Sequence, residues 1–182
     1  MIRTLVSLCL ILSTAATALP QETRTAFAMK TGILLRMHVV AQDDTQEMQR
    51  VKLCVRDAVQ AAYAADDTSG PMLSKAAAML PTLRRAAREA AAAEGFTGPV
   101  AVTIEKASFD KRSLDGLTIP AGEYPALMIR LGQARGHNWW GLIDPELAVR
   151  CAALPETDLW DWSFMGFLRA LFNIRGEVFC HE

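Results

Sequence analysis

Apolar and polar residues alternate along the stretch 32–41. Successive side chains of a strand point to opposite faces, so this period of two predicts a strand with two different sides. One side is wholly apolar and consists of Ile33, Leu35, Met37 and Val39. The other side carries Arg36 and His38 between Leu34 and Val40. We therefore expect the apolar side to pack in the core.

A helical period of apolar residues follows, from about Thr45 to Ala65. Its stripe consists of Met48, Val51, Val55, Ala58, Val59 and Ala62. This spacing is typical of a helix that packs on one side. Asp44 precedes the helix and Glu47 follows three residues later. We expect Asp44 to cap the helix in an arrangement like a capping box.

An alanine-rich region at 72–94 predicts a second helical segment. Pro81 must break or kink it, because proline removes a backbone hydrogen bond, and Gly95 is a good C-terminal stop. The other predicted elements are strands at 100–104 and 124–132, a connection at 107–121 with a turn at Asp115-Gly116, a loop at 132–141, a short helix near Pro145 and an amphipathic helix at 159–172. The order β-α-α-β-β-α predicts a small single domain of the α/β or α+β class, with helices packed on a short sheet.

The N-terminus has the pattern of a secretory signal peptide. Arg3 supplies a positive charge, an apolar run covers 5–12, and Ala16 and Ala18 are spaced as an A-x-A cleavage site. We expect cleavage to leave Leu19 as the first residue. An uncleaved anchor stays open as an alternative, although the apolar run is short for a membrane span. In both cases the rest of the chain is delivered across a membrane.

These patterns divide the chain into a signal peptide at 1–18, an N-terminal linker at 19–30, a folded domain at 31–153 and a C-terminal helical tail at 154–182. No second long apolar segment follows the signal, so we expect no membrane span after cleavage. The net charge is −1, and it becomes −2 when Arg3 is lost. A general nucleic-acid binder usually has a basic excess, so we predict no nucleic-acid partner.

Of the four cysteines, Cys9 lies in the predicted signal. Three remain in the exported chain, so at most one disulfide forms among them. We expect Cys151 to pair with Cys180 and to fix the tail, a link that contributes about 3–4 kcal/mol. Cys54 lies beside the apolar stripe of its helix, and we expect a buried, inert thiol. The chain has no CxxC pair or His/Cys cluster, and we predict no metal and no cofactor.

Two adjacent tryptophans, Trp139 and Trp140, follow His137 and Asn138. In a strand one ring would enter the core and the other would remain at the surface. Tryptophan is common in protein interfaces, where a large ring with one N–H donor makes an efficient anchor. The alternative, in which both rings cover the end of the sheet, stays open.

Titratable residues gather near the end of the first predicted strand, where Asp43 follows Arg36 and His38. A histidine with a carboxylate neighbour can do acid–base work, but no nucleophile in a recognised setting accompanies it. His137 and Asp144 are a second loose pair without a motif. We therefore expect His38 to be a structural histidine with satisfied hydrogen bonds.

The tripeptide Pro120-Ala121-Gly122 predicts a rigid turn before the strand at 124–132. Proline fixes φ, and glycine permits backbone angles that other residues resist. We expect Glu123 and Tyr124, which follow this turn, to be exposed.

Two blocks of the chain match a known pattern. The first block, R-x-H-V-x-A-x-x-D with a K-x-x-V-R-D helix, is matched by Arg36, His38, Val39, Ala41, Asp44, Lys52, Val55, Arg56 and Asp57. The second block, P-A-G-x-Y-x-A-L with G-x-N-W-W, is matched at 120–127 and 136–140. In this order, and with Phe109 and Arg112 between them, the blocks resemble the stage II sporulation protein R family over about 35–140.

The chain departs from that family at three positions. Family members usually have one cysteine directly after the tryptophan pair and another seven residues later. Here these positions are Gly141 and Ala148, so that disulfide cannot form and the pair Cys151–Cys180 would substitute for it. Ala134 replaces a glycine of the preceding loop.

The resemblance implies an exported signal and not an enzyme. Such proteins are made in the forespore and enter the space between the forespore and mother-cell membranes. There they trigger a membrane-embedded aspartic protease, which cleaves the precursor of sigma factor E. The resemblance assigns no catalytic residue. Our candidate partner-binding residues are Arg36, His38, Asp43, Asp44, Arg56, Tyr124, His137, Asn138, Trp139 and Trp140.

We expect the loop 132–140 and the adjacent end of the first strand to form one functional surface. A second hypothesis is a small secreted hydrolase of cell-wall material, with Glu123 or Asp144 as the acid near His137 and the tryptophans stacked on sugar rings. Sugar hydrolysis commonly needs two carboxyl groups about 5–10 Å apart, and the sequence offers no convincing pair. A third hypothesis is another exported binding role.

Overall fold

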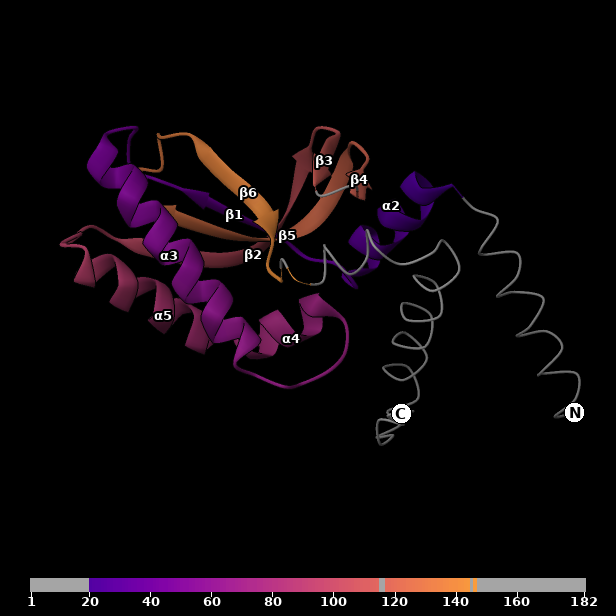
Figure 1. The fold of residues 1–182 in the computed structure, drawn as a ribbon, viewed down its shortest axis with the longest axis horizontal. Coiled ribbons are helices and arrows are strands. Elements are labelled where there is room, and N and C mark those ends of the chain that lie inside the picture. Colours follow the sequence, from indigo (N-terminus) through magenta and orange to yellow (C-terminus); the bar gives the residue numbers. More distant parts are fainter. Residues whose placement is uncertain (1–19, 115–116, 145, 147–182) are drawn as a thin grey trace, which may run out of the picture.

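The computed structural model describes residues 20–114, 117–144 and 146. These residues form a mixed α and β domain, which confirms the predicted fold class (Figure 1). The main sheet has the order β2-β5-β1-β6, and β3 and β4 form a separate hairpin beside it. β1 is parallel to β5, whereas β2–β5 and β1–β6 are antiparallel pairs. The strands are β1 Arg36–Val40, β2 Val100–Phe109, β3 Arg112–Leu114, β4 Leu117–Ile119, β5 Gly122–Leu131 and β6 Asn138–Leu142, and the helices are α2 Gln21–Thr31, α3 Gln46–Ala64, α4 Met72–Ala78 and α5 Leu80–Ala93.

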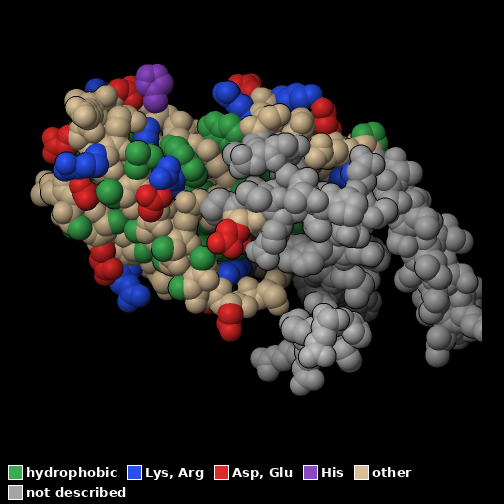
Figure 2. All heavy atoms as spheres, viewed as in Figure 1, with side chains coloured by type: hydrophobic (Ala, Val, Ile, Leu, Met, Phe, Trp, Pro, Cys, Tyr) green, Lys and Arg blue, Asp and Glu red, His purple; other side chains and the backbone are tan. Residues whose placement is uncertain are grey.

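Helices α3 and α5 pack against each other and cover one face of the sheet (Figure 1). Met37 and Val39 of β1 lie in register with Leu127 and Ile129 of β5, and all four side chains are fully buried. The helices add the buried residues Val51, Val55, Val59, Leu83, Ala87 and Ala91. The prediction that the apolar side of the first strand packs in the core is therefore confirmed. Positive and negative side chains are interspersed over the surface in Figure 2.

The helices differ from the predictions at one cap. Thr45 caps α3, because its hydroxyl accepts a hydrogen bond from the backbone N–H of Met48 at 3.4 Å. The expectation that Asp44 is the cap is wrong, since its carboxylate binds the backbone N–H of His137 instead. The break at Pro81 is confirmed: α4 ends before Met79, and the proline lies in the first turn of α5, where its missing N–H is not needed.

Part of the predicted linker at 19–30 is helical. Helix α2 packs on β4 and β5 and buries Arg24, Thr25, Ala28 and Met29. It ends at Gly32, whose φ of 75° is left-handed and suits glycine. The sequence did not indicate this helix, because its buried positions include polar residues, which hide the apolar period. No helix in the described part of the chain is long and apolar enough to cross a membrane.

The second half contains more strand than the sequence predicts. β2 continues to Phe109, and the connection at 107–121 includes the hairpin β3–β4. The predicted loop at 132–141 is wrong from Asn138 onward, because β6 pairs with β1 there. Its sequence, Asn-Trp-Trp-Gly-Leu, lacks the alternation that marks a half-buried strand. The predicted turn at 115–116, the helices near 145 and at 159–172, Cys151 and Cys180 lie outside the described residues.

Candidate binding surface

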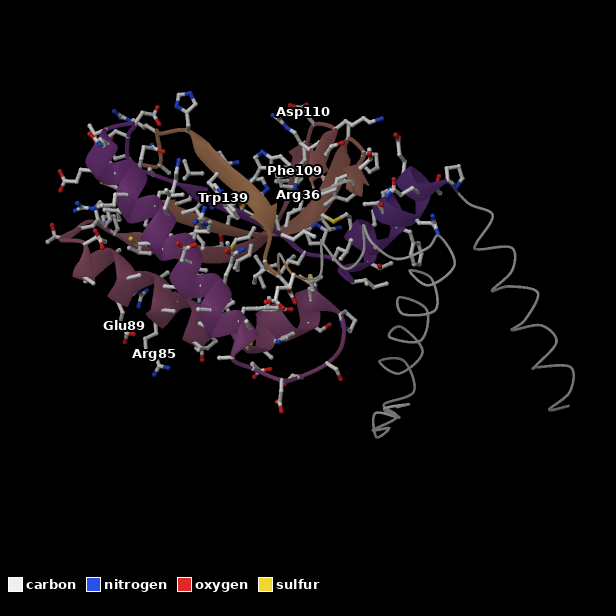
Figure 3. All side chains as sticks on the ribbon, in the orientation of Figure 1. Arg36, Arg85, Glu89, Phe109, Asp110 and Trp139 are labelled. Atoms are coloured by element: carbon white, nitrogen blue, oxygen red, sulfur yellow. The ribbon has the colours of Figure 1, made fainter. Side chains whose placement is uncertain are left out.

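The sheet face that points away from α3 and α5 carries a cluster of aromatic and nitrogen-bearing side chains. Arg36 and His38 come from β1, and Trp140 lies directly opposite His38 on β6. Phe109 reaches the cluster from the end of β2, and Figure 3 shows it close to Arg36. We call this set the polar face; it consists of Arg36, His38, Phe109, Arg112, Asn138 and Trp140.

The guanidinium group of Arg36 is buried between aromatic rings. Its Cζ atom lies 4.1 Å from the ring centre of Phe109 and 5.3 Å from that of Trp140. The residue is only 2 % exposed. Burial, and next the positive charge of Arg112, lower the pKa of Arg36 to about 10, while Tyr124 opposes this shift. Arg36 therefore stays charged at neutral pH, although its Nε and Nη1 atoms have no hydrogen-bond partner.

The His38 ring stacks on Phe109, with centroids 4.5 Å apart and an interplanar angle of 15°. Burial, and next the charge of Arg36, lower the pKa of His38 to about 4, so the ring is neutral at pH 7. Its Nδ1 atom lies 2.6 Å from Nδ2 of Asn138, and the amide donates to it. The proton then resides on Nε2, which is buried without a partner. The expectation that His38 is fully satisfied is therefore wrong.

The end of β1 and the loop before β6 are held together by Asp44. Its two carboxylate oxygens lie 2.6 Å from the backbone nitrogen and from Nδ1 of His137. The backbone N–H of His137 is the main cause of the lowered pKa of Asp44. The ammonium group of Lys52, a buried residue of α3, donates to the carbonyl oxygen of His137 at 3.1 Å. A Cβ atom at Gly136 would lie 2.5 Å from the Asp43 carbonyl oxygen, so only glycine fits there.

The two tryptophans point to opposite faces of β6, as the alternation of a strand requires. Trp139 packs on the core at the helix side, with the guanidinium group of Arg56 5.2 Å from its ring centre. Trp140 lies on the polar face, where Arg112 is 5.8 Å from its ring centre. Both residues are half-buried. A Cβ atom at Gly141 would lie 2.7 Å from the Trp139 ring, so this glycine makes room for the ring.

The structure divides the candidate residues among four places. The polar face includes Arg36, His38, Asn138 and Trp140. The contact between the end of β1 and the loop before β6, which we call the loop junction, contains Asp43, Asp44 and His137. The helix side holds Arg56 and Trp139, and the core holds Tyr124. The expected exposure of Tyr124 is wrong, because the residue is 1 % exposed and its hydroxyl donates to the carbonyl oxygen of Pro120.

The sequence did not assign Phe109, Arg112 or Lys52 to the candidate site. Phe109 lies an even number of residues after Thr103, so a longer alternation in β2 would have placed it on the polar face. Cys54 is free and half-buried, and burial raises the pKa of its thiol. Within the described ranges, no group of three or more His, Cys, Asp or Glu side chains could hold a metal.

Comparisons with known proteins identify the family of this chain. The sequence model of the family "Stage II sporulation protein R" matches residues 31–153. The curated stage II sporulation protein R of Bacillus subtilis (strain 168) is 32 % identical over 117 residues, which are 62 % of this chain and 52 % of that protein. The chain thus spans about half the length of this relative. No solved structure matches the chain. The chain belongs to the stage II sporulation protein R family.

Proposed function

We propose that this chain is an exported signalling protein of endospore formation. In this proposal it crosses the forespore membrane by means of residues 1–18 and acts in the space between the forespore and mother-cell membranes. There it binds a membrane-embedded aspartic protease and activates cleavage of the sigma factor E precursor. The observation that carries the proposal is the family match over residues 31–153, which includes both blocks that suggested it.

The described surface suits a binding role. Trp140 is half-buried beside two arginines on the sheet face that points away from α3 and α5. Interfaces are enriched in tryptophan and arginine, because these side chains bury a large area and still offer hydrogen-bond donors. The loop junction next to this face is fixed by Asp44 and Lys52, so a partner would meet a preformed surface.

The fold places the residues that the hydrolase hypothesis needs far apart. Glu123 lies at the start of β5 and Asp144 follows the end of β6, whereas His137 precedes β6 at the opposite end of the sheet. At ~3.3 Å per residue, either carboxylate is roughly 25 Å from His137 along the strands. His137 instead pairs with Asp44. Neither pair could act on one glycosidic bond.

Deletion and complementation in a spore-forming host test the proposal. Deletion of the gene should abolish processing of the sigma factor E precursor on an immunoblot, and the full chain should restore it. A chain without residues 2–18 serves as the control, because it should accumulate in the forespore and restore nothing. Normal processing in the deletion strain would contradict the proposed function.

A further inference from the structure

Three N–H groups on the polar face have no acceptor. They are Nε and Nη1 of Arg36 and Nε2 of His38, and both residues are 2 % exposed. The two residues are separated by one position on β1, so their side chains leave the same side of the strand. Nearly all buried polar groups in folded proteins have a hydrogen-bond partner. Three orphaned donors at adjacent positions therefore need an explanation.

Among the described residues, no carboxylate compensates the charge of Arg36 either. Arg36 forms no ion pair within the described ranges, and the positive charge of Arg112 repels it. The rings of Phe109 and Trp140 stabilise the cation through their faces. They do not accept the hydrogen bonds that the guanidinium directs in its own plane. By contrast, Arg130 on β5 is paired with the Glu105 carboxylate.

We propose that Arg36 and His38 form a binding site for a carboxylate group of a protein ligand. A carboxylate supplies one negative charge and two oxygens, each with two lone pairs, which suffice for three N–H donors. A phosphate fits less well, because it brings up to two charges and a third set of acceptors that the flanking rings would leave unsatisfied. The site lies one side chain below the surface, since Phe109 and Trp140 above it are half-buried.

The assignment of the site uses only this chain, while the identity of the ligand protein rests on the proposed function. An acidic side chain of the membrane protease would then be the group that is bound. Because the ligand site can be tested on the purified chain, a failure there is separate from a failure of precursor processing.

NMR titration of the purified chain tests the site directly. We expect sodium acetate to shift the Arg36 Nε–H and His38 Nε2–H resonances in a saturable way, unlike sodium chloride at the same ionic strength. Acetyl-aspartyl amide and acetyl-glycine then distinguish a side-chain carboxylate from a chain terminus; tighter binding of acetyl-aspartyl amide is expected. Shifts equal to those in chloride, or tighter binding of inorganic phosphate than of acetate, would overturn the proposal.

Two variants sharpen the test. Arg36→Gln should weaken acetate binding at least about tenfold, because it removes the charge that the carboxylate neutralises. Arg130→Gln is the matched control, since Arg130 already has a carboxylate partner, and its affinity for acetate should equal that of the unaltered chain. Equal acetate affinity of Arg36→Gln and the unaltered chain would overturn the assignment. If Arg36→Gln does not fold, His38→Gln, which should also weaken binding, replaces it.

Discussion

The two sides of β1 and β5 differ in how they are built. Toward α3 and α5 the strands present fully buried aliphatic side chains, such as Val39 and Leu127. On the other side β1 presents Arg36 and His38, buried just as deeply but with orphaned donors. Apolar burial stabilises a fold, whereas burial of an unpaired charge or donor destabilises it. The comparison teaches that the helix side maintains the fold, whereas the polar face buries donors that do not stabilise it.

The largest effect is expected from a cavity on the helix side. Leu127→Ala should lower the free energy of unfolding by roughly 4 kcal/mol, because it leaves a void in a close-packed core. Thr103→Ala, on the polar side of β2, is the control and should cost less than about 1 kcal/mol. Urea denaturation measures both. An equal loss of free energy of unfolding in both variants would contradict the difference between the two sides.

Because of His38 on the polar face, the free energy of unfolding should decrease at acidic pH. The folded pKa of His38 is lowered from 6.5 to about 4, so the unfolded chain binds this proton more readily. The contribution of His38 is fully present above pH 6.5 and is lost as the pH falls through about 4, by about 3 kcal/mol in total. Chemical denaturation from about pH 7 to about pH 4 measures it. His38→Gln should show a correspondingly shallower loss, and identical pH profiles would contradict the account.

The tryptophan pair compares the two faces at adjacent positions. Trp139→Ala should lower the free energy of unfolding by about 2 kcal/mol, because this half-buried ring packs on the core. Trp140→Ala should cost about 1 kcal/mol or less, since it removes contacts to a buried cation that then gains access to water. Thermal melting of both exported variants tests this order. A reversed order would place Trp140 in the core.

The smallest expected effect concerns the loop junction. Asp44→Asn removes the charge that binds the backbone N–H of His137, so this amide should exchange faster with solvent. The overall melting temperature should hardly change, because the pair lies at the surface. Glu47→Gln, in the first turn of α3, is the control. Unchanged exchange at His137 would show that Asp44 does not hold the loop.

The core was predictable because the spacing of apolar residues indicates which side chains are buried. The alternation at 33–39 and the stripe from Met48 to Val59 each place side chains on one face without knowledge of the partner element. The apolar pattern did not predict helix α2 or strand β6. Arg24 is buried in α2, and two tryptophans are adjacent in β6, so neither element shows a regular apolar period. Local patterns cannot show that distant elements bury a polar residue.

The candidate site was predictable only in part. The sequence placed Arg36 and His38 on one side of a strand. For the tryptophans it left two arrangements open, because it predicted a loop at 132–141 and opposite faces only if these residues formed a strand. It could not show that Phe109, far along the chain, covers both residues. It also could not show that Asp44 reaches His137 and not its own helix, because that choice depends on the position of β6. Orphaned donors become visible only when every neighbour is placed.

The most direct test of the polar face is precursor processing in a strain whose only copy carries Trp140→Ala. The exported amount and melting temperature of this variant should stay close to those of the unaltered chain. The account predicts that processing of the sigma factor E precursor is lost under these conditions. Full processing by the folded, exported Trp140→Ala chain would contradict it.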